Sequence, residues 1–132
     1  MDDVIEGGCL CGKTRYRLRE KPVRISNCHC IDCRRGSGAA VVTWGVLRPN
    51  EVEMLAGELR KVRHAERLRS FASCCGTPLF FQEDEASATI DVTIASLDHP
   101  EPYAPGVEIW TEDRLPWVQT DSTRKIYPQG RR

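Results

Sequence analysis

Three cysteines stand close together in the stretch Asn27-Cys28-His29-Cys30-Ile31-Asp32-Cys33-Arg34-Arg35, in the pattern C-x-C-x-x-C. These short spacings bring three sulfurs within reach of one ion once the chain turns, and zinc binds thiolates in a tetrahedron. Three protein ligands leave the fourth position for water or a substrate thiolate, which is typical of a reactive site. We therefore predict a reactive zinc site at Cys28, Cys30 and Cys33, with either His29 or Asp32 completing the metal sphere or supporting it.

A second group of cysteines is split between two distant parts of the chain. The first half is a C-x-C pair between glycines, in Gly7-Gly8-Cys9-Leu10-Cys11-Gly12, and glycine lets the backbone fold tightly around an ion. The second half is the adjacent pair in Cys74-Cys75-Gly76-Thr77-Pro78, where the glycine and the proline favour the local turn that joint ligation requires. Two near and two far cysteines predict a closed structural zinc site at Cys9, Cys11, Cys74 and Cys75.

The length and composition fit one small domain. With 132 residues, we expect a single domain over residues 1–132. The hydrophobic fraction of 40% is ordinary for a globular chain, but only 7% of the residues are aromatic, so few large side chains can fill a core. We therefore expect metal ions to contribute to the stability of the fold.

The charge and the cysteine count narrow the function classes. There are 19 basic and 19 acidic residues, so the formal net charge is zero and nothing favours nucleic-acid or membrane binding. No apolar run is long enough to span a bilayer, and the acidic N-terminus lacks the apolar segment of a signal peptide. Seven cysteines is an odd count, which argues against a secreted disulfide framework. We expect a cytoplasmic protein whose cysteines are metal ligands, and the oligomeric state stays open.

Strand patterns dominate the chain, and no long amphipathic helix is visible. Alternating or β-branched segments predict strands at residues 13–18, 23–25, 39–47, 67–71, 79–82, 87–95 and 107–110. A hairpin of residues 51–55 and 59–63 is also expected around Ala56-Gly57-Glu58. The helical content is one short turn from Ile31 to about Arg35, which Gly36 should end. The predicted fold class is mostly β.

The arginines and tryptophans each have two possible roles. Arg34 and Arg35 either lower the pKa of the nearby thiols and bind a substrate carboxylate, or are solvated charges. Alternation favours a solvated sheet face for the arginines of residues 60–69.

Trp44 lies in an apolar strand and is expected in the core, whereas Trp110 and Trp117 either wall a pocket or anchor the terminal segment, which is the more frequent role.

Four motifs occur in an order that resembles one known family. They are G-G-C-x-C-G at Gly7 to Gly12, C-H-C-x-x-C-R at Cys28 to Arg34, C-G-T-P-L at Cys75 to Leu79, and R-x-P-W at Arg114 to Trp117. Together they resemble the glutathione-dependent formaldehyde-activating enzyme (GFA) family, which also includes centromere protein V. The resemblance covers nearly the whole chain, and the joint occurrence of the motifs is specific, although each C-x-C alone is not.

The resemblance implies a β-tent fold of antiparallel sheets pinned by two zinc ions. It places the structural ion at Cys9, Cys11 and Cys75, and the reactive ion at Cys28, Cys30 and Cys33. The family usually has F-C-x-x-C-G in the last motif, and this sequence has Ala72 where the first of those cysteines belongs. Cys74 is the substitute that the sequence offers; without it, the structural site would be three-coordinate or would borrow another ligand.

The activity that the resemblance implies is carbon–sulfur lyase chemistry, the reversible joining of glutathione and formaldehyde to S-hydroxymethylglutathione. Cys28, Cys30 and Cys33 would be the catalytic cysteines, and their zinc would hold the thiol sulfur as thiolate and polarise the aldehyde. Arg34 or Arg35 could bind a glutathione carboxylate, so the partners would be a small-molecule thiol and a small aldehyde. The alternatives are a zinc-stabilised module that binds a thiol or a partner without turnover, and a purely structural zinc protein.

Overall fold

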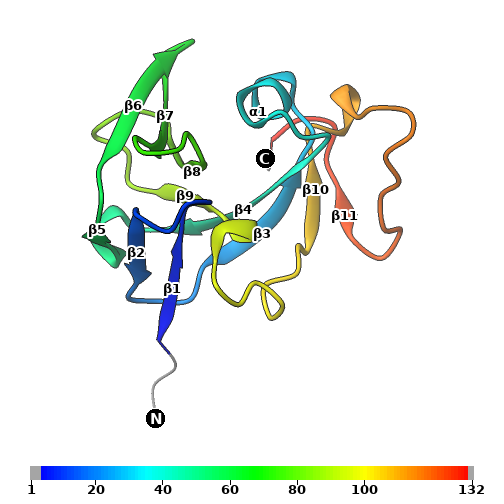
Figure 1. The fold of residues 1–132 in the computed structure, drawn as a ribbon. Helices are drawn as coiled ribbons and strands as arrows, with labels where there is room; N and C mark the ends of the chain where they lie inside the picture. Colours follow the sequence, from blue (N-terminus) through cyan, green and yellow to red (C-terminus); the bar gives the residue numbers. More distant parts are fainter. Residues whose placement is uncertain (1–3, 131–132) are drawn as a thin grey trace.

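The fold is built almost entirely of strands, which confirms the predicted mostly β class (Figure 1). The computed structural model describes residues 4–130. Eight strands form a large sheet, in the spatial order β11 (Lys125–Ile126), β10 (Val107–Ile109), β3 (Val23–Cys28), β4 (Val42–Leu47), β9 (Ile90–Thr93), β8 (Pro78–Gln82), β7 (Arg67–Ala72) and β6 (Leu59–His64). A smaller sheet of three strands has the order β1 (Ile5–Gly8), β2 (Arg15–Leu18) and β5 (Val52–Ala56).

The small sheet contains a strand that the sequence patterns did not predict. Strand β1 pairs antiparallel with β2 through residues that include Gly7 and Gly8. Glycine disfavours the interior of a strand. From the sequence, Gly7 and Gly8 are therefore expected only to flank the first cysteine pair. The packing explains the residue type, because a Cβ atom at Gly7 would collide with the Tyr16 hydroxyl and the Ser96 carbonyl oxygen.

The predicted hairpin of residues 51–55 and 59–63 is wrong. Both strands exist, but β5 pairs with β2 in the small sheet, whereas β6 pairs with β7 in the large one. The chain crosses from one sheet to the other at Gly57, which has a φ of 78° and lies against Thr14. A left-handed residue at a close backbone approach requires glycine, so the turn residues mark a crossover and not a hairpin.

The large sheet contains parallel as well as antiparallel strand pairs, whereas the resemblance implies antiparallel sheets. Strand β10 pairs parallel with both β3 and β11. Parallel neighbours need a long connection, and β3 and β10 are separated by most of the other strands in the chain. The register sets Ile109 opposite Cys28, so the end of β10 lies beside the first cysteine of the central motif.

Helix α1 (Ile31–Ser37) follows β3 and lies above the middle of the large sheet (Figure 1). It is longer than predicted, because it passes through Gly36 and ends at Gly38, whose φ of 65° is left-handed. The Gly38 amide donates to the Arg34 carbonyl oxygen at 2.7 Å, which closes the last turn. Three 3-10 helices complete the regular structure: η1 (Pro49–Glu51), η2 (Ile94–Ser96) and η3 (Thr111–Asp113). Within residues 4–130, no helix has the length and apolar character needed to cross a membrane.

Two groups of buried side chains form the core. The main group joins the two sheets and contains Tyr16, Leu18, Leu47, Ala72, Leu79, Phe80, Ile90, Val92, Ile94 and Leu97. The second group lies under α1 and contains Cys28, Cys33, Val42 and Trp44. Trp44 is therefore a core residue, as predicted. Two of the central cysteines are part of this second core, so the candidate site is built into packed structure and not onto a loose loop.

Candidate metal centres

The three cysteines of the central motif converge at the junction of β3 and α1. Cys28 is the last residue of β3, Cys30 is the N-cap of the helix, and Cys33 lies in its first turn. Their sulfur atoms all lie within 4.8 Å of one another, and the Cys30 sulfur accepts a hydrogen bond from the Cys33 amide at 3.2 Å. Cys28 and Cys33 are buried and Cys30 is partly exposed. The cluster could hold one metal ion and is accessible from the side of Cys30.

The electrostatics of this cluster favour one thiolate and two thiols when no metal is bound. The Cys28 and Cys30 thiols donate to the Cys33 sulfur and hold the pKa of Cys33 at about 2, and the charge of Arg69 contributes. The same contacts with Cys30 and Cys33, together with burial, raise the pKa of Cys28. The contact with Cys28 acts to lower the pKa of Cys30, but Cys33 and burial outweigh it and raise that pKa. A divalent cation would favour the thiolate form of all three, because its charge offsets their mutual repulsion.

Arg69 brings a cation to this cluster, a role that the sequence analysis missed. Its Nη2 atom lies 3.7 Å from the Cys33 sulfur. Its guanidinium carbon lies 4.9 Å from the centre of the Phe81 ring, so a cation–π contact holds the side chain in place. Alternation had put this arginine on a solvated sheet face, and no local pattern could show otherwise. The contact depends on the tertiary fold, which brings the Arg69 side chain of β7 to Cys33 and Gly36 of α1.

A small cavity adjoins Arg69 between α1 and the large sheet. Its volume is about 80 Å³, and its walls include Trp44, Phe71 and Phe80 from the strands and Gly36 from the helix. One molecule of liquid water occupies about 30 Å³, so a space of this size takes only a few heavy atoms. It can accommodate a small aldehyde fragment but not a peptide-sized thiol.

Neither His29 nor Asp32 joins the three sulfurs. In the described part of the chain, the group that could hold a metal here consists of the three cysteines alone. The His29 ring is wholly buried, and its Nε2 atom lies 2.7 Å from Oε1 of Glu108 in β10. Asp32 is exposed at the surface of the helix. Of the two roles considered for these residues, completing the metal sphere is therefore wrong for both.

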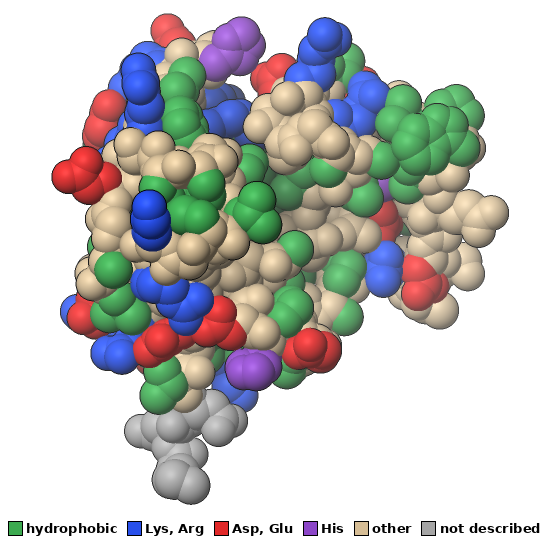
Figure 2. All heavy atoms as spheres, viewed as in Figure 1, with side chains coloured by type: hydrophobic (Ala, Val, Ile, Leu, Met, Phe, Trp, Pro, Cys, Tyr) green, Lys and Arg blue, Asp and Glu red, His purple; other side chains and the backbone are tan. Residues whose placement is uncertain are grey.

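Arg34 and Arg35 line an open hollow on the outer side of α1. Its other walls include Ala39, Leu115 and Trp117, and the Nε atom of Arg34 is buried with no hydrogen-bond partner among the described residues. The space-filling view shows Lys and Arg atoms beside hydrophobic atoms at the upper right, over α1 and the loop that follows η3 (Figure 2). A cationic and apolar surface of this kind suits a ligand that carries a carboxylate.

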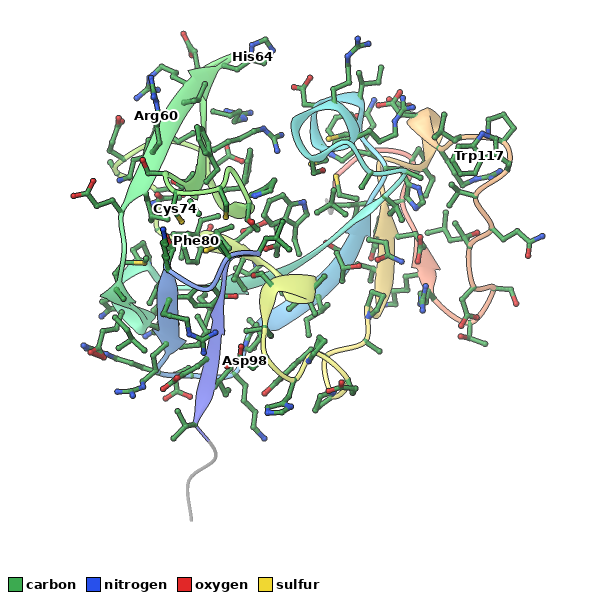
Figure 3. All side chains as sticks on the ribbon, viewed as in Figure 1. Arg60, His64, Cys74, Phe80, Asp98 and Trp117 are labelled. Carbon is green, nitrogen blue, oxygen red and sulfur yellow. The ribbon has the colours of Figure 1, made fainter. Side chains whose placement is uncertain are left out.

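Trp117 does not anchor the terminal segment. Its side chain is 72% exposed, and it projects from the loop at the edge of the molecule (Figure 3). The loop is held instead by Arg114, whose Nη1 atom donates to the Val118 carbonyl oxygen at 2.5 Å. Trp110, by contrast, packs against the second core, as the anchoring role predicts.

All four cysteines predicted for the structural site converge. The cluster joins the turn between β1 and β2 to the turn between β7 and β8, and its sulfurs lie within 4.8 Å of one another. The Cys74 sulfur is 3.6 Å from Cys9, 3.3 Å from Cys11 and 4.0 Å from Cys75. In a tetrahedral site with zinc–sulfur bonds of about 2.3 Å, neighbouring sulfurs lie about 3.8 Å apart. The donor set and its spacing therefore fit zinc.

Hydrogen bonds to the sulfurs support this cluster. Burial acts to raise the pKa of Cys9, but the Thr14 amide at 3.3 Å and the neighbouring thiols outweigh it and lower that pKa to about 5. The Thr77 hydroxyl lies 3.3 Å from the Cys75 sulfur and lowers the pKa of Cys75 to about 7. Thiolates are the form that binds metal, so these bonds prepare the cluster for an ion.

The structure brings Cys74, and not residue 72, to the cluster. Ala72 is 0% exposed and packs in the main core, at the end of β7. The turn begins there, because the Ala72 carbonyl oxygen accepts from the Gly76 amide at 2.7 Å. Cys74 stands inside the turn and is exposed, with its sulfur among the other three (Figure 3).

Comparisons with known proteins agree with the motifs. A family described as "Glutathione-dependent formaldehyde-activating enzyme" matches residues 4–113, a range that includes both cysteine clusters. No curated protein matches the chain. Among solved structures, the chain is similar to the crystal structure of a Rhodobacter sphaeroides protein that was a structural-genomics target. The TM-score is 0.59 and the sequence identity 19%, over 74% of this chain and 93% of that chain. At this identity, the likeness concerns the fold alone.

Proposed function

The chain belongs to the glutathione-dependent formaldehyde-activating enzyme family, and on that premise we propose that it is a zinc-dependent carbon–sulfur lyase. Its substrate would be the adduct of a glutathione-type thiol with formaldehyde or another small aldehyde. The observation that carries this proposal is the convergence of three cysteine sulfurs at a partly accessible cluster next to the guanidinium of Arg69. A fully ligated structural site would need a fourth protein donor here, and the described residues supply none.

The donor set of the proposed site fits zinc. Cys28, Cys30 and Cys33 would hold the ion and leave one position for a sulfur from outside the protein. When bound, zinc supplies a positive charge that keeps thiols ionised near neutral pH and polarises a carbonyl oxygen. The four-cysteine cluster would hold a second zinc with no free position, and so would have a structural role.

The reaction itself needs few groups from the chain. In the direction of adduct formation, the thiolate sulfur attacks the carbonyl carbon, a carbon–sulfur bond forms, and the carbonyl π electron pair moves to the oxygen. That oxygen then takes a proton from solvent, and the reverse reaction returns the proton, the aldehyde and the thiolate. Arg69 would stabilise the negative charge that develops on the oxygen, because its guanidinium is fixed beside the cluster.

The hollow on the outer side of α1 would bind the rest of the thiol. Arg34 and Arg35 offer charge-assisted hydrogen bonds to a carboxylate, and Leu115 and Trp117 offer apolar contact. The hollow is lined by Arg34 and Arg35 of α1, whereas the Arg69 cavity is lined by Gly36 and Ser37 of the same helix. This arrangement separates recognition of a large thiol from that of a small aldehyde.

The test is the exchange rate between free formaldehyde and its glutathione adduct, measured by two-dimensional exchange NMR on the zinc-loaded protein. The adduct also forms without an enzyme, so the expected result is a saturable acceleration above that background, which Cys28→Ser abolishes. If wild-type protein leaves the exchange rate at the uncatalysed value, the lyase proposal is wrong. Binding of glutathione without acceleration would instead favour the alternative, a zinc-stabilised module that binds a thiol without turnover.

A further inference from the structure

A network of polar side chains, centred on two buried groups, lies beside the three-cysteine cluster. The His29 side chain donates from Nε2 to Oε1 of Glu108 at 2.7 Å, and both side chains are 1% exposed. The other carboxylate oxygen of Glu108 accepts from Nδ2 of Asn27 at 3.0 Å and from Nη1 of Arg124 at 2.7 Å. A carboxylate so deeply buried is costly unless it is paired and hydrogen-bonded. These contacts therefore help to fix the conformation of the chain around Asn27 and His29.

Backbone pairing with β10 and a hydrogen bond from Thr43 also hold the residues around Asn27 and His29. Strand β10 pairs with β3 in a register that sets Glu108 opposite Asn27, and the His29 amide donates to the Ile109 carbonyl oxygen at 3.0 Å. The Thr43 hydroxyl donates to Oδ1 of Asn27 at 2.6 Å, which fixes the orientation of that amide. His29 is the residue between Cys28 and Cys30, so the orientation of its backbone determines where the two neighbouring sulfurs point.

His29 contributes through one ring nitrogen only. Its Nδ1 atom is buried and has no hydrogen-bond partner among the described residues. An unpaired buried acceptor destabilises the fold. A side chain chosen for packing alone would avoid this cost, so the bond from Nε2 to Glu108 is the feature that accounts for a histidine here.

Arg124 comes from a part of the chain that the family match does not include. The match ends at residue 113, and Arg124 immediately precedes β11. Its position is set by that strand, which pairs parallel with β10, and by the Tyr127 amide, which donates to the Glu108 carbonyl oxygen at 2.9 Å. The C-terminal segment thus delivers a guanidinium to a carboxylate next to the cluster.

We propose that Arg124, Glu108 and His29 are positioning residues for the three-cysteine cluster. They hold the segment from Cys28 to Cys30 in the conformation that keeps the sulfurs convergent, and so determine how slowly the cluster releases zinc. This inference rests on the proposed function, in which that cluster binds zinc. It assigns to the C-terminal segment, residues 114–130, a role in completing the site.

The test is the rate of zinc release to a chromogenic chelator from the full-length, zinc-loaded protein. Native mass spectrometry counts the ions, and Cys28→Ser identifies the release phase of the three-cysteine cluster. Loss of a group that orients a metal ligand typically weakens binding by about 10- to 100-fold. We expect Arg124→Met and Glu108→Gln each to accelerate this phase at least tenfold, and Arg124→Lys to restore most of the wild-type rate. The rate of zinc release from the four-cysteine cluster should not change. A general loss of stability would instead accelerate release from both clusters.

The matched control is Arg17→Met, which removes an ion pair of similar length in the small sheet, between Arg17 and Glu6 at 2.8 Å. It should change neither phase. If Arg124→Met and Glu108→Gln lower the melting temperature but leave the three-cysteine phase at the wild-type rate, or accelerate both phases equally, the positioning role is wrong. In that case the wild-type protein still binds two zinc ions, and the lyase proposal is not affected. A single zinc in both wild type and Cys28→Ser would overturn both proposals.

Discussion

The Nη2 atom of Arg69 lies 3.7 Å from the sulfur of Cys33, although 36 residues separate the two in the sequence. The guanidinium is not free to move away, because it packs over the Phe81 ring. The three-cysteine cluster therefore has a fixed cation on the side of the large sheet, in addition to any ion that its sulfurs hold. This relationship connects the packing of helix and sheet to the chemistry of the cluster.

Replacing Arg69 by methionine should slow catalysis without unfolding the protein. The substitution keeps an unbranched, apolar stem but removes the guanidinium, and with it the charge beside Cys33 and the cation–π contact with Phe81. Loss of one fixed donor to a developing oxyanion typically costs about 100-fold or more in rate. We expect the enzyme-dependent exchange between formaldehyde and its glutathione adduct to fall at least tenfold.

Arg67→Met is the control for this prediction, because Arg67 lies on the same strand but pairs with Glu83 at the surface, at 3.1 Å. It should leave the exchange rate unchanged. Equal rates for Arg69→Met and wild type would show that the cation has no part in the reaction.

Replacing Cys74 by serine should remove one zinc and destabilise the fold. The Cys74 sulfur lies among those of Cys9, Cys11 and Cys75, and the cluster ties the small sheet to the large one. We expect native mass spectrometry to show one zinc instead of two, and the melting temperature to fall. Ser73→Ala, at the exposed neighbouring position, should change neither quantity.

Restoring the usual family cysteine should not rescue that variant. The Ala72 side chain packs in the main core, and the bond from the Gly76 amide to the Ala72 carbonyl oxygen fixes the start of the turn. A cysteine at position 72 would place its sulfur in the core, away from the cluster. We expect the double variant Ala72→Cys, Cys74→Ser to bind one zinc. Recovery of two zinc ions would show that the turn rearranges.

Alkaline pH should destabilise the protein through Tyr16. Burial raises the pKa of this phenol to about 12, against about 10 for an exposed tyrosine. The pKa of Tyr16 is higher in the folded protein than in the unfolded chain. The contribution of its neutral phenol to the free energy of unfolding is therefore fully present below pH 10 and is lost as the pH rises from 10 to 12. Two pKa units correspond to about 3 kcal/mol of unfolding free energy.

Tyr16→Phe removes this titration together with a hydrogen bond to Ser96, at 2.6 Å. Chemical denaturation should show a loss of about 1 kcal/mol at pH 8, from the hydrogen bond, but a smaller decline than wild type between pH 10 and 12. Tyr103→Phe keeps Tyr16 and should keep the decline of wild type. Parallel pH profiles for wild type and Tyr16→Phe would contradict the assignment.

The cysteine groups were predictable from sequence because the spacing within each group is local, and the joining of Cys9 and Cys11 to Cys74 and Cys75 followed from the four ligands that a structural zinc needs. The segments around Cys28 and Cys9 each carry their cysteines within a few residues, and glycines flank the pair at Cys9 and Cys11. The short helix after the central motif was predictable for the same reason. Only its end was wrong, because Gly36 and Gly38 are equally able to stop a helix and the backbone adopts the left-handed conformation at the second.

The groups around the three-cysteine cluster were not predictable, because their contacts depend on sheet register. Arg69 lies in an alternating strand that gives no sign of which face meets α1. Glu108 offered a weak sign, as a single carboxylate between two apolar residues, but its partner Arg124 is far along the chain. The turn residues around Gly57 predict a hairpin, but they do not reveal which strands pair, and the chain crosses between the two sheets there.

Reversing the charge of Arg35 should weaken binding of a thiol only where the thiol carries a carboxylate. Arg35 is exposed and lines the open hollow with Trp117. A charge-assisted hydrogen bond contributes about 1.5–3 kcal/mol, so Arg35→Glu should raise KM for glutathione by about tenfold or more while kcat changes little. With 2-mercaptoethanol, which has no carboxylate, wild type and variant should have the same KM. Arg60→Glu, on the exposed strand β6, should behave as wild type with both thiols, since Arg60 lies outside the hollow (Figure 3). An equal rise in KM for both thiols would mean that Arg35 affects the cluster itself, and the hollow would then lose its role in binding the thiol.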